Sequence, residues 1–235
     1  MDSDGVMNPT RNVWVIPGAI IIAGLILAIA IFVIRTGNAS VPVTALPEMI
    51  EPVTVADHII GNPNAQVMIV EYSDIDSDDG KNFHAALLQL MTEYAEDGRV
   101  AWVYRHLPLT TVHGYAQRHA EAAECAALLG GPDAFWRFID QAHTLAPGGA
   151  ELNPESYPVI AQTLGIENTA FTECVVSGKF SAKVRSQAHD ALGAGAEGAP
   201  FTVVFIEGSK PAAINGALPY TSLKELVDQS LSQSQ

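Results

Sequence analysis

Apolar residues form two kinds of pattern along the chain, and together they predict alternating strands and helices. Short continuous apolar runs at 67–72 and 100–107 are typical of buried strands. Between these runs, residues 81–97 carry apolar side chains at a helical spacing that ends at Gly98. A strand, a helix and a strand in this order predict a βαβ unit with two parallel strands.

The second part of the chain changes to helical patterns and then returns to strands. Strong helix formers dominate from about residue 114 to 193, with breaks at glycine and proline, which predicts an all-helical insert. Strand-like apolar runs follow at 201–208 and 211–217, and a helical spacing closes the chain at 220–233. We therefore predict an α/β fold in which a βαβ unit, a helical insert and a ββα unit follow one another.

A long apolar run near the N-terminus predicts a membrane anchor. No charged residue lies between Val13 and Ile34, and arginines flank the run at 11 and 35. At ~1.5 Å per residue in a helix, this run is long enough to cross a hydrocarbon core of ~30 Å. We expect a short N-terminal segment at 1–12 and one transmembrane helix at 13–34. A cleaved signal peptide is the alternative, because residues 37–39 resemble a cleavage site, but the long run and the non-basic leader favour an anchor.

The region after the predicted anchor divides into a linker and an acidic domain. Residues 35–55 contain prolines and few large apolar side chains, which predicts an extended linker before a domain at 56–235. The formal charge of -14 comes from the region after residue 35, because two arginines and two aspartates balance in the first part. Such a domain repels phosphates and anionic headgroups, so we expect no nucleic-acid partner.

Short segments spread over the predicted domain match, in order, the characteristic segments of a known family. They are DHIIGNPNAQVMIVEYSD at 57–74, RHLPL at 105–109, EAAECA at 121–126, ECVVSGKFSAKV at 173–184, GAPFTVVFIEG at 198–208 and GALPY at 216–220. Together they resemble the DsbA-like branch of the thioredoxin superfamily. The resemblance implies a thioredoxin fold with a helical insert. We accordingly expect a single-pass protein of the cell membrane with its soluble domain outside the cytoplasm.

The chain departs from this family at the catalytic motif. Relatives carry Cys-x-x-Cys at the start of the first long helix, where unpaired backbone amides and the helix dipole lower the pKa of a thiol. The aligned residues here are Ser77, Asp78, Asp79 and Gly80. Neither a hydroxyl group nor a glycine forms a disulfide, so thiol–disulfide exchange by this loop is excluded. The resemblance therefore indicates a degenerate member of the family.

Other positions of the family's catalytic apparatus remain. Glu71 matches the buried acid that assists proton transfer in redox relatives, and without a thiol it is expected to be a buried carboxylate that needs a partner. Pro200, after Ala199, matches the cis-proline whose neighbouring backbone pairs with an extended substrate. We expect a cis bond at Pro200. Whether the groove at Ala199 and Pro200 still binds a peptide stays open.

Two further chemistries for the acidic loop 74–80 are rejected on spacing. A calcium loop needs a glycine at its sixth position and a glutamate at its twelfth, and counting from Asp74 both are missing. A hydrolase base is also missing, since two helical turns place His84 about 10 Å from Ser77. We predict instead that Ser77 or Asp76 caps the helix, with acidic residues in its first turn.

No metal or cofactor is expected. The histidines show no metal-ligand spacing and are expected at the surface or in helix packing; they include those at 106, 113, 119, 143 and 189.

The two cysteines, Cys125 and Cys174, lie on separate predicted helices. An even number of cysteines in an exported domain predicts one structural disulfide, and relatives have cysteines at what look like the same positions. A redox-active pair is the alternative. It is less favoured because neither cysteine lies at a helix N-terminus beside a basic residue.

These features favour a membrane-anchored binding or assembly module over an enzyme. Its partner is expected to be a protein or a membrane complex. Two alternatives remain: a divergent relative of thiol–disulfide oxidoreductases that uses Cys125 and Cys174, and a scaffold subunit of a membrane complex.

Overall fold

The computed structural model describes residues 43–45, 50–94 and 96–233, which belong to one compact unit that extends from Val41 to Gln235. Its strands are β1 (Val43–Ala45), β2 (His58–Gly61), β3 (Val67–Ser73), β4 (Val100–His106), β5 (Phe201–Ile206) and β6 (Ala212–Asn215). Its helices are α2 (Asp78–Tyr94), α3 (Ala116–Gly130), α4 (Pro132–Leu145), the short 3₁₀ helix η1 (Pro154–Ser156), α5 (Tyr157–Leu164), α6 (Asn168–Ser177), α7 (Ser181–Gly193) and α8 (Tyr220–Gln233).

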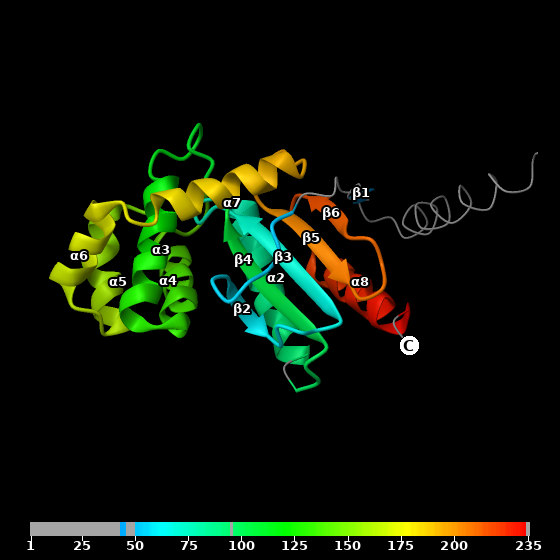
Figure 1. Cartoon of the computed structure of the whole chain (residues 1–235). Helices are drawn as coiled ribbons and strands as arrows, with labels where there is room; N and C mark the ends of the chain where they lie inside the picture. Colours follow the sequence, from blue (N-terminus) through cyan, green and yellow to red (C-terminus); the bar gives the residue numbers. More distant parts are fainter. Residues whose placement is uncertain (1–42, 46–49, 95, 234–235) are drawn as a thin grey trace, which may run out of the picture. The chain divides into compact units, whose positions relative to one another are not determined.

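The strands form one sheet in the order β1-β6-β5-β3-β4-β2. Strands β3 and β4 are parallel and are joined through α2, as the apolar pattern predicted, whereas β5 pairs with β3 in the antiparallel direction. Figure 1 shows the helices α3 to α6 gathered beside the sheet and α7 lying across it. The predicted α/β order, with its helical insert between β4 and β5, is confirmed for the described part of the chain.

Side chains alternate in direction along the strands, and this alternation divides the core into two layers. Val67, Ile69 and Trp102 face α2 and α8, in a cluster that continues into the helical insert. Val70 and Val103, one residue further along their strands, belong to a second cluster with α7 on the opposite face. Side chains of a strand point alternately to its two faces, so both faces of these central strands are buried.

Helix α2 begins earlier than its apolar pattern predicts. It extends over Asp78–Tyr94, and the chain then turns through Gly98, whose φ of +65° lies in the left-handed region that favours glycine. The first turn of the helix is polar, so apolar spacing could not reveal it. The start of α2 is determined by its cap at Ser77, described below.

Part of the predicted linker is bound to the domain. Strand β1 lies within residues 35–55 and pairs with β6 at one edge of the sheet, while β2 lies at the opposite edge. Residues 50–57, which lead into β2, lie on one face of the sheet, where Ile50 and Val53 pack against the same cluster as α7. We call residues 50–57 the crossing segment. This part of the predicted extended linker therefore packs on the domain.

The predicted membrane anchor at 13–34 lies outside the described residues. Within the described residues, no helix combines the length and apolar character needed to span a bilayer.

Candidate functional site: a degenerate catalytic loop

Ser77 caps helix α2, as predicted. Its Oγ accepts a hydrogen bond from the backbone amide of Gly80 at 3.2 Å, which satisfies one of the unpaired donors of the first turn. The same hydroxyl donates a hydrogen bond to the carbonyl oxygen of Ala199 at 3.1 Å. Ser77 is buried, and its hydroxyl therefore joins the start of α2 to the segment before β5.

The remaining positions of the motif differ in their exposure. Asp78 and Asp79 are exposed in the first turn of α2, where acidic side chains complement the helix dipole. Gly80 is buried, and a Cβ placed there would lie 2.8 Å from Oγ of Ser73 and 3.0 Å from the carbonyl oxygen of Asp74. The position of the second family cysteine is thus closed to a side chain unless Ser73 or the backbone moves.

Glu71 lies in β3, the strand that precedes this loop, and is not exposed to solvent. Its Oε2 accepts a hydrogen bond from Nε1 of Trp102 at 3.0 Å, whereas Oε1 has no hydrogen-bond partner. Burial raises the pKa of Glu71 from 4.5 to about 7, and the nearby His84 opposes this shift. The predicted buried carboxylate has its partner in Trp102. Glu71 is thus a buried acid next to the capped loop whose pKa is raised by the loss of solvation.

The peptide bond between Ala199 and Pro200 is cis, as expected. The carbonyl of Ala199 accepts the bond from Ser77, and the carbonyl of Pro200 accepts one from the amide of Gly216 at 2.9 Å. Backbone acceptors on both sides of this bond therefore already have partners within the domain. Peptide binding at this groove stays a prediction.

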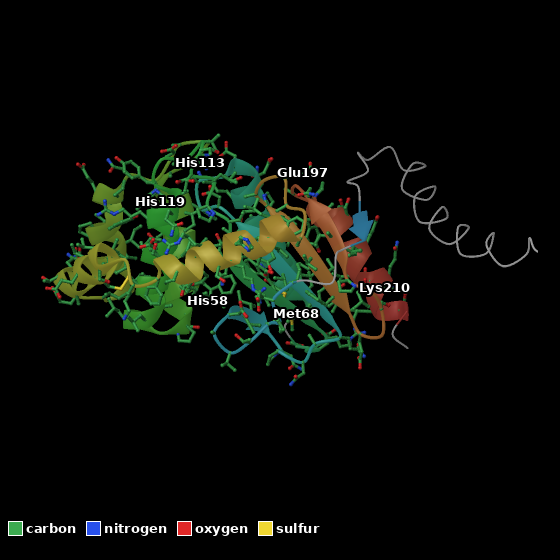
Figure 2. All side chains as sticks on the ribbon, turned by 45° about the horizontal axis from the view of Figure 1, so that its top comes forward. His58, Met68, His113, His119, Glu197 and Lys210 are labelled. Carbon is green, nitrogen blue, oxygen red and sulfur yellow. A yellow bond between two sulfur atoms is a disulfide. The ribbon has the colours of Figure 1, made fainter. Side chains whose placement is uncertain are left out.

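A second set of polar side chains joins the loop to the helical insert and was missed from the sequence. Asp74 accepts hydrogen bonds from the amide of Leu109 and pairs with Nδ1 of His113 at 2.9 Å. Asp76 Oδ2 lies 3.3 Å from Nε2 of His119, although neither atom makes a hydrogen bond. Figure 2 shows His113 and His119 near each other. The two aspartates are far from the two histidines in sequence, and no spacing signal indicates that they come into contact.

Burial changes the acid–base properties of the pair formed by Asp76 and His119. Loss of solvation raises the pKa of Asp76, because it disfavours the charged carboxylate. It lowers the pKa of His119 to about 4, because it disfavours the imidazolium. Nδ1 of His119 also lies 2.7 Å from the hydroxyl of Tyr157, on helix α5. At neutral pH His119 is therefore an uncharged hydrogen-bonding residue inside the fold.

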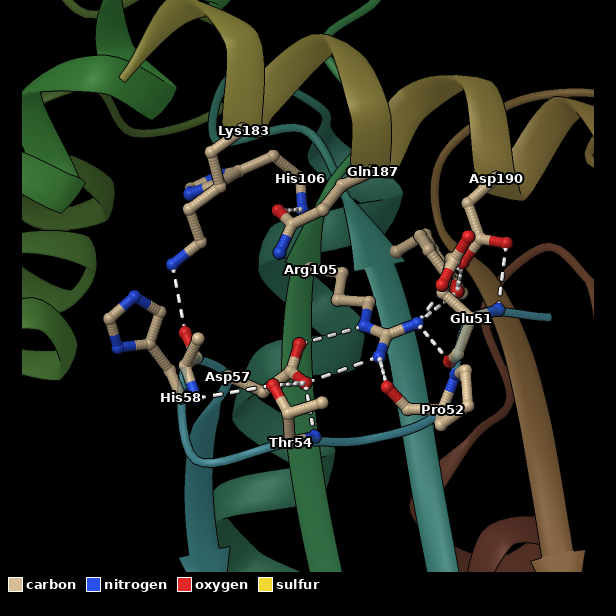
Figure 3. A network of polar contacts seen from close by, with 12 residues as sticks. Glu51, Pro52, Thr54, Asp57, His58, Arg105, His106, Lys183, Gln187 and Asp190 are labelled. Carbon is tan, nitrogen blue, oxygen red and sulfur yellow. Dashed lines mark hydrogen bonds and ion pairs between the residues drawn. The ribbon is translucent and has the colours of Figure 1, made fainter. Parts of the chain in front are cut away.

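A buried arginine attaches the crossing segment to the sheet and to α7, and this network too was missed from the sequence. Arg105 donates to Asp57 through Nε at 2.8 Å and to Asp190 through Nη1 at 3.0 Å. The same guanidinium donates to the carbonyl oxygens of Glu51 and Pro52 at 2.9 and 3.0 Å. Figure 3 shows it between these partners. One cation thus joins β4, α7 and both ends of the crossing segment.

Glu124 on α3 forms a neighbouring hub. Its Oε1 lies 3.0 Å from Nε2 of His58 and 3.1 Å from Nε2 of His106, and its Oε2 accepts a bond from Lys183 at 2.8 Å. Burial raises the pKa of Glu124, but its contacts with His106 and His58 outweigh burial and hold this pKa well below its usual value. His106 is buried, so the expectation that such histidines lie at the surface or only pack between helices is incomplete. The hub links the helical insert to the sheet.

The predicted disulfide between Cys125 and Cys174 is present, with an S–S distance of 2.02 Å. It joins α3 to α6, and both residues are buried. Figure 2 shows it as a yellow bond in the helical insert. Among the described residues, no group of three or more histidine, cysteine or acidic side chains is arranged to hold a metal ion.

Comparisons with known proteins agree with this architecture. The family model for thioredoxin matches residues 53–229. Structures similar to the chain include oxidised BdbD from Bacillus subtilis, with a TM-score of 0.66, 18% identity, and coverage of 78% of this chain and 97% of BdbD. DsbA2 from Pseudomonas aeruginosa has a TM-score of 0.61 and 23% identity, with 76% and 96% of the two chains covered. At these identities the structures demonstrate the fold.

Curated relatives are proteins of a different size. The chain is 32% identical over 154 residues to the Na(+)/H(+) antiporter NhaA 3 of Salinispora tropica, which covers 66% of this chain and 22% of the antiporter. The NhaA 1 antiporter of Salinispora arenicola is 31% identical over the same length, with the same coverage. The chain thus spans about a fifth of the length of these relatives. From the thioredoxin match over residues 53–229 and the architecture described above, we conclude that the chain belongs to the thioredoxin family and has the DsbA-like form of its fold.

Proposed function

We propose that the protein is a membrane-anchored module whose DsbA-like domain, outside the cytoplasm, binds or assembles another protein and does not exchange disulfides through its degenerate loop. The observation that carries this proposal is the pair of hydrogen bonds made by the hydroxyl group of Ser77. Its hydroxyl caps α2 and is bonded to Ala199, at the position where redox relatives have a reactive thiol. A neutral, buried hydroxyl with both partners in place is a structural group.

A redox assay tests the absence of catalysis. The purified full chain is expected neither to reduce insulin nor to oxidise a model dithiol above the rate of the buffer. A matched variant in which Cys125→Ala and Cys174→Ala are combined is the control, because it removes the only two sulfhydryl positions of the sequence. Activity in the parent that disappears in this variant contradicts the proposal and supports the second candidate function, thiol–disulfide exchange by this pair.

The second candidate rests on one specific observation. Cys125 and Cys174 are within bonding distance and form a disulfide, so the pair is able to cycle between two redox states if a reductant reaches it. Burial of both residues opposes such access. A reduction potential far below that of the glutathione pool would assign the pair to structure, whereas ready reduction under native conditions would favour the second candidate.

We further propose that the partner is a membrane protein of the cation–proton antiporter class, or a complex that contains one. The support comes from the relatives. A match of 154 residues is too long to lie before residue 53, so it includes much of the folded domain. In the relative, the matching region is part of an antiporter chain. A domain that is covalently joined to a protein in one organism is a candidate for non-covalent association with a similar protein in another. Scaffolding within such a complex is compatible with this role.

Purification from native membranes tests the partner. The tagged full chain is expected to co-purify with an antiporter at a defined ratio and to lose it when exposed residues of the domain are changed. Recovery of the chain alone, under conditions that preserve other membrane complexes, contradicts the proposal. Protease accessibility in intact cells and spheroplasts, with N-terminal sequencing of the mature chain, tests the anchor at 13–34 and the location of the domain.

A further inference from the structure

The segment after α4 lies against the degenerate loop. Residues 146–152, which we call the cover loop, begin and end at the buried residues Ala146 and Leu152, and the residues between them are exposed. The turn passes through Gly148 and Gly149, whose φ values of +60° and +79° favour glycine at both positions. The cover loop is thus a short exposed turn between two fixed ends.

Three residues at the start of α2 hold the cover loop. The ammonium group of Lys81 donates to the carbonyl oxygens of Ala146 and Ala150, at 2.7 and 3.0 Å. Asp76 Oδ1 accepts a bond from the amide of Leu152 at 2.8 Å. At Gly149 a Cβ would lie 2.7 Å from Oδ2 of Asp78, so the turn is in close contact with the first turn of the helix.

The attachment of the exposed middle of the cover loop is polar and local, whereas its end residues, Ala146 and Leu152, belong to the apolar core. Lys81 connects both sides of the turn, and its own nearest carboxylate, Oδ1 of Asp78, is 3.9 Å away. The exposed middle of the loop, residues 147–151, adds no member to the two apolar clusters of the core. Segments with few buried apolar contacts open at lower free energy than the core strands. Loss of the three hydrogen bonds to Lys81 and Asp76 is therefore expected to free the middle of this loop without unfolding the sheet.

Two polar atoms that make no hydrogen bond lie 3.3 Å from each other, beside the end of the cover loop. Asp76 bonds the loop through Oδ1, whereas its Oδ2 and Nε2 of His119 make no hydrogen bond. Both residues are almost completely shielded from solvent, with exposures of 2% and 0%. A buried carboxylate oxygen without a hydrogen bond is an unfavourable arrangement that a well-placed donor relieves. Because the loop is bonded to Asp76 at Leu152, opening of the loop releases Oδ1 of Asp76 from this bond.

We propose that residues 146–152 form a lid over the degenerate loop, that Lys81 is its latch, and that the open lid gives a hydrogen-bond donor of a partner protein access to Asp76. This use of the lid rests on the binding function proposed above. The lid itself does not, because its opening is measurable on the protein alone.

Native-state hydrogen exchange of the full chain, in detergent micelles, tests the lid. In the parent, the amide of Leu152 is expected to exchange by local opening, at a rate at least about tenfold higher than the amides of β3 and nearly independent of low denaturant concentrations. In Lys81→Gln, exchange at 148–152 is expected to increase by a further factor of about ten or more, with β3 and β4 unchanged.

Lys224→Gln is the matched control, because this lysine also makes several polar contacts, but with Tyr94, Glu93 and Asp228 on α2 and α8. It is expected to leave exchange at 148–152 unchanged. If Lys81→Gln does not fold, Lys81→Met keeps the apolar stem and removes only the ammonium group.

Two results overturn the proposal. One is exchange of Leu152 only through global unfolding, at the same free energy as β3. The other is an unchanged rate at 148–152 in the Lys81 variant that folds. No partner is present in this experiment, so its result depends on the lid alone, and failure of the proposed binding function would leave it unchanged.

Discussion

The hydroxyl group of Ser77 donates a hydrogen bond to the carbonyl oxygen of Ala199, 3.1 Å away and 122 residues later in the chain. It bridges the start of α2 and the cis bond at Pro200, which are the two parts of the site that the DsbA-like resemblance singled out. Where a redox enzyme uses this position for chemistry, the present chain uses it to hold two segments together. The consequences for stability and access are testable.

Ser77→Ala is expected to destabilise the domain by about 1 to 2 kcal/mol, because it removes the cap of α2 and the bond to Ala199. Ser77→Asn keeps an acceptor for the amide of Gly80 and should recover part of this loss. Urea unfolding followed by the fluorescence of Trp102 and Trp136 measures both variants. Equal stability of Ser77→Ala and the parent would show that the hydroxyl is not a structural group.

Glu71→Gln is expected to change the pH dependence of stability. The folded pKa of Glu71, about 7, lies above its ordinary 4.5, so the unfolded chain releases this proton first as the pH rises. The contribution of the protonated acid to the free energy of unfolding is therefore fully present below pH 4.5 and is lost as the pH rises to about 7. Glutamine does not ionise, so the free energy of unfolding of the variant, relative to that of the parent, should increase by about 3 kcal/mol as the pH rises across this window.

Urea unfolding at pH 5, 6, 7 and 8 measures this difference between variant and parent. Glu155→Gln, at an exposed position, controls for the loss of one negative charge. A difference between Glu71→Gln and the parent that does not vary with pH would show that Glu71 ionises normally in the folded protein.

Arg105→Gln is expected to destabilise the domain by about 3 to 5 kcal/mol, because it leaves the buried carboxylates of Asp57 and Asp190 without their cation. It should also make the crossing segment accessible to protease. Arg99→Gln is the control, since Arg99 pairs with Asp97 at the surface and its loss should change stability by less than about 1 kcal/mol. Similar effects of the two substitutions would contradict a specific attachment through Arg105.

Removal of the disulfide by Cys125→Ala with Cys174→Ala is expected to destabilise the domain by about 4 kcal/mol in the chain-entropy model, because the bridge closes a loop with a sequence separation of 49. The far-ultraviolet circular dichroism spectrum should stay unchanged at low temperature. A variant as stable as the parent would remove the structural explanation for the pair and strengthen the redox alternative.

Much of the fold could be predicted because it depends on local periodicity and on short segments. The runs at 67–72 and 100–107 indicated strands β3 and β4, and the pattern between them indicated α2. The polar residues at the helix start likewise indicated Ser77 or Asp76 as its cap, and the structure shows that the cap is Ser77. The disulfide between Cys125 and Cys174 was predicted from their even number in an exported domain and from the resemblance to relatives with cysteines at similar positions.

The remaining part of the site depends on contacts between distant segments. Nothing near Arg105 in the sequence indicates that it bonds Asp57 and Asp190, and nothing near Asp76 indicates His119. The attachment of residues 43–45 to β6 was missed for the same reason, because a three-residue strand has no period of its own.

The sequence by itself determined the order of the elements, the absence of a thiol from the loop and the cap that replaced it, because these depend on residues close together in the chain. Only the tertiary structure decided what the loop touches. Ser77 meets Ala199, Lys81 meets the cover loop and Arg105 holds the crossing segment. The physical reason is that buried polar side chains must find partners, and which partner each finds depends on how the helices and the sheet pack.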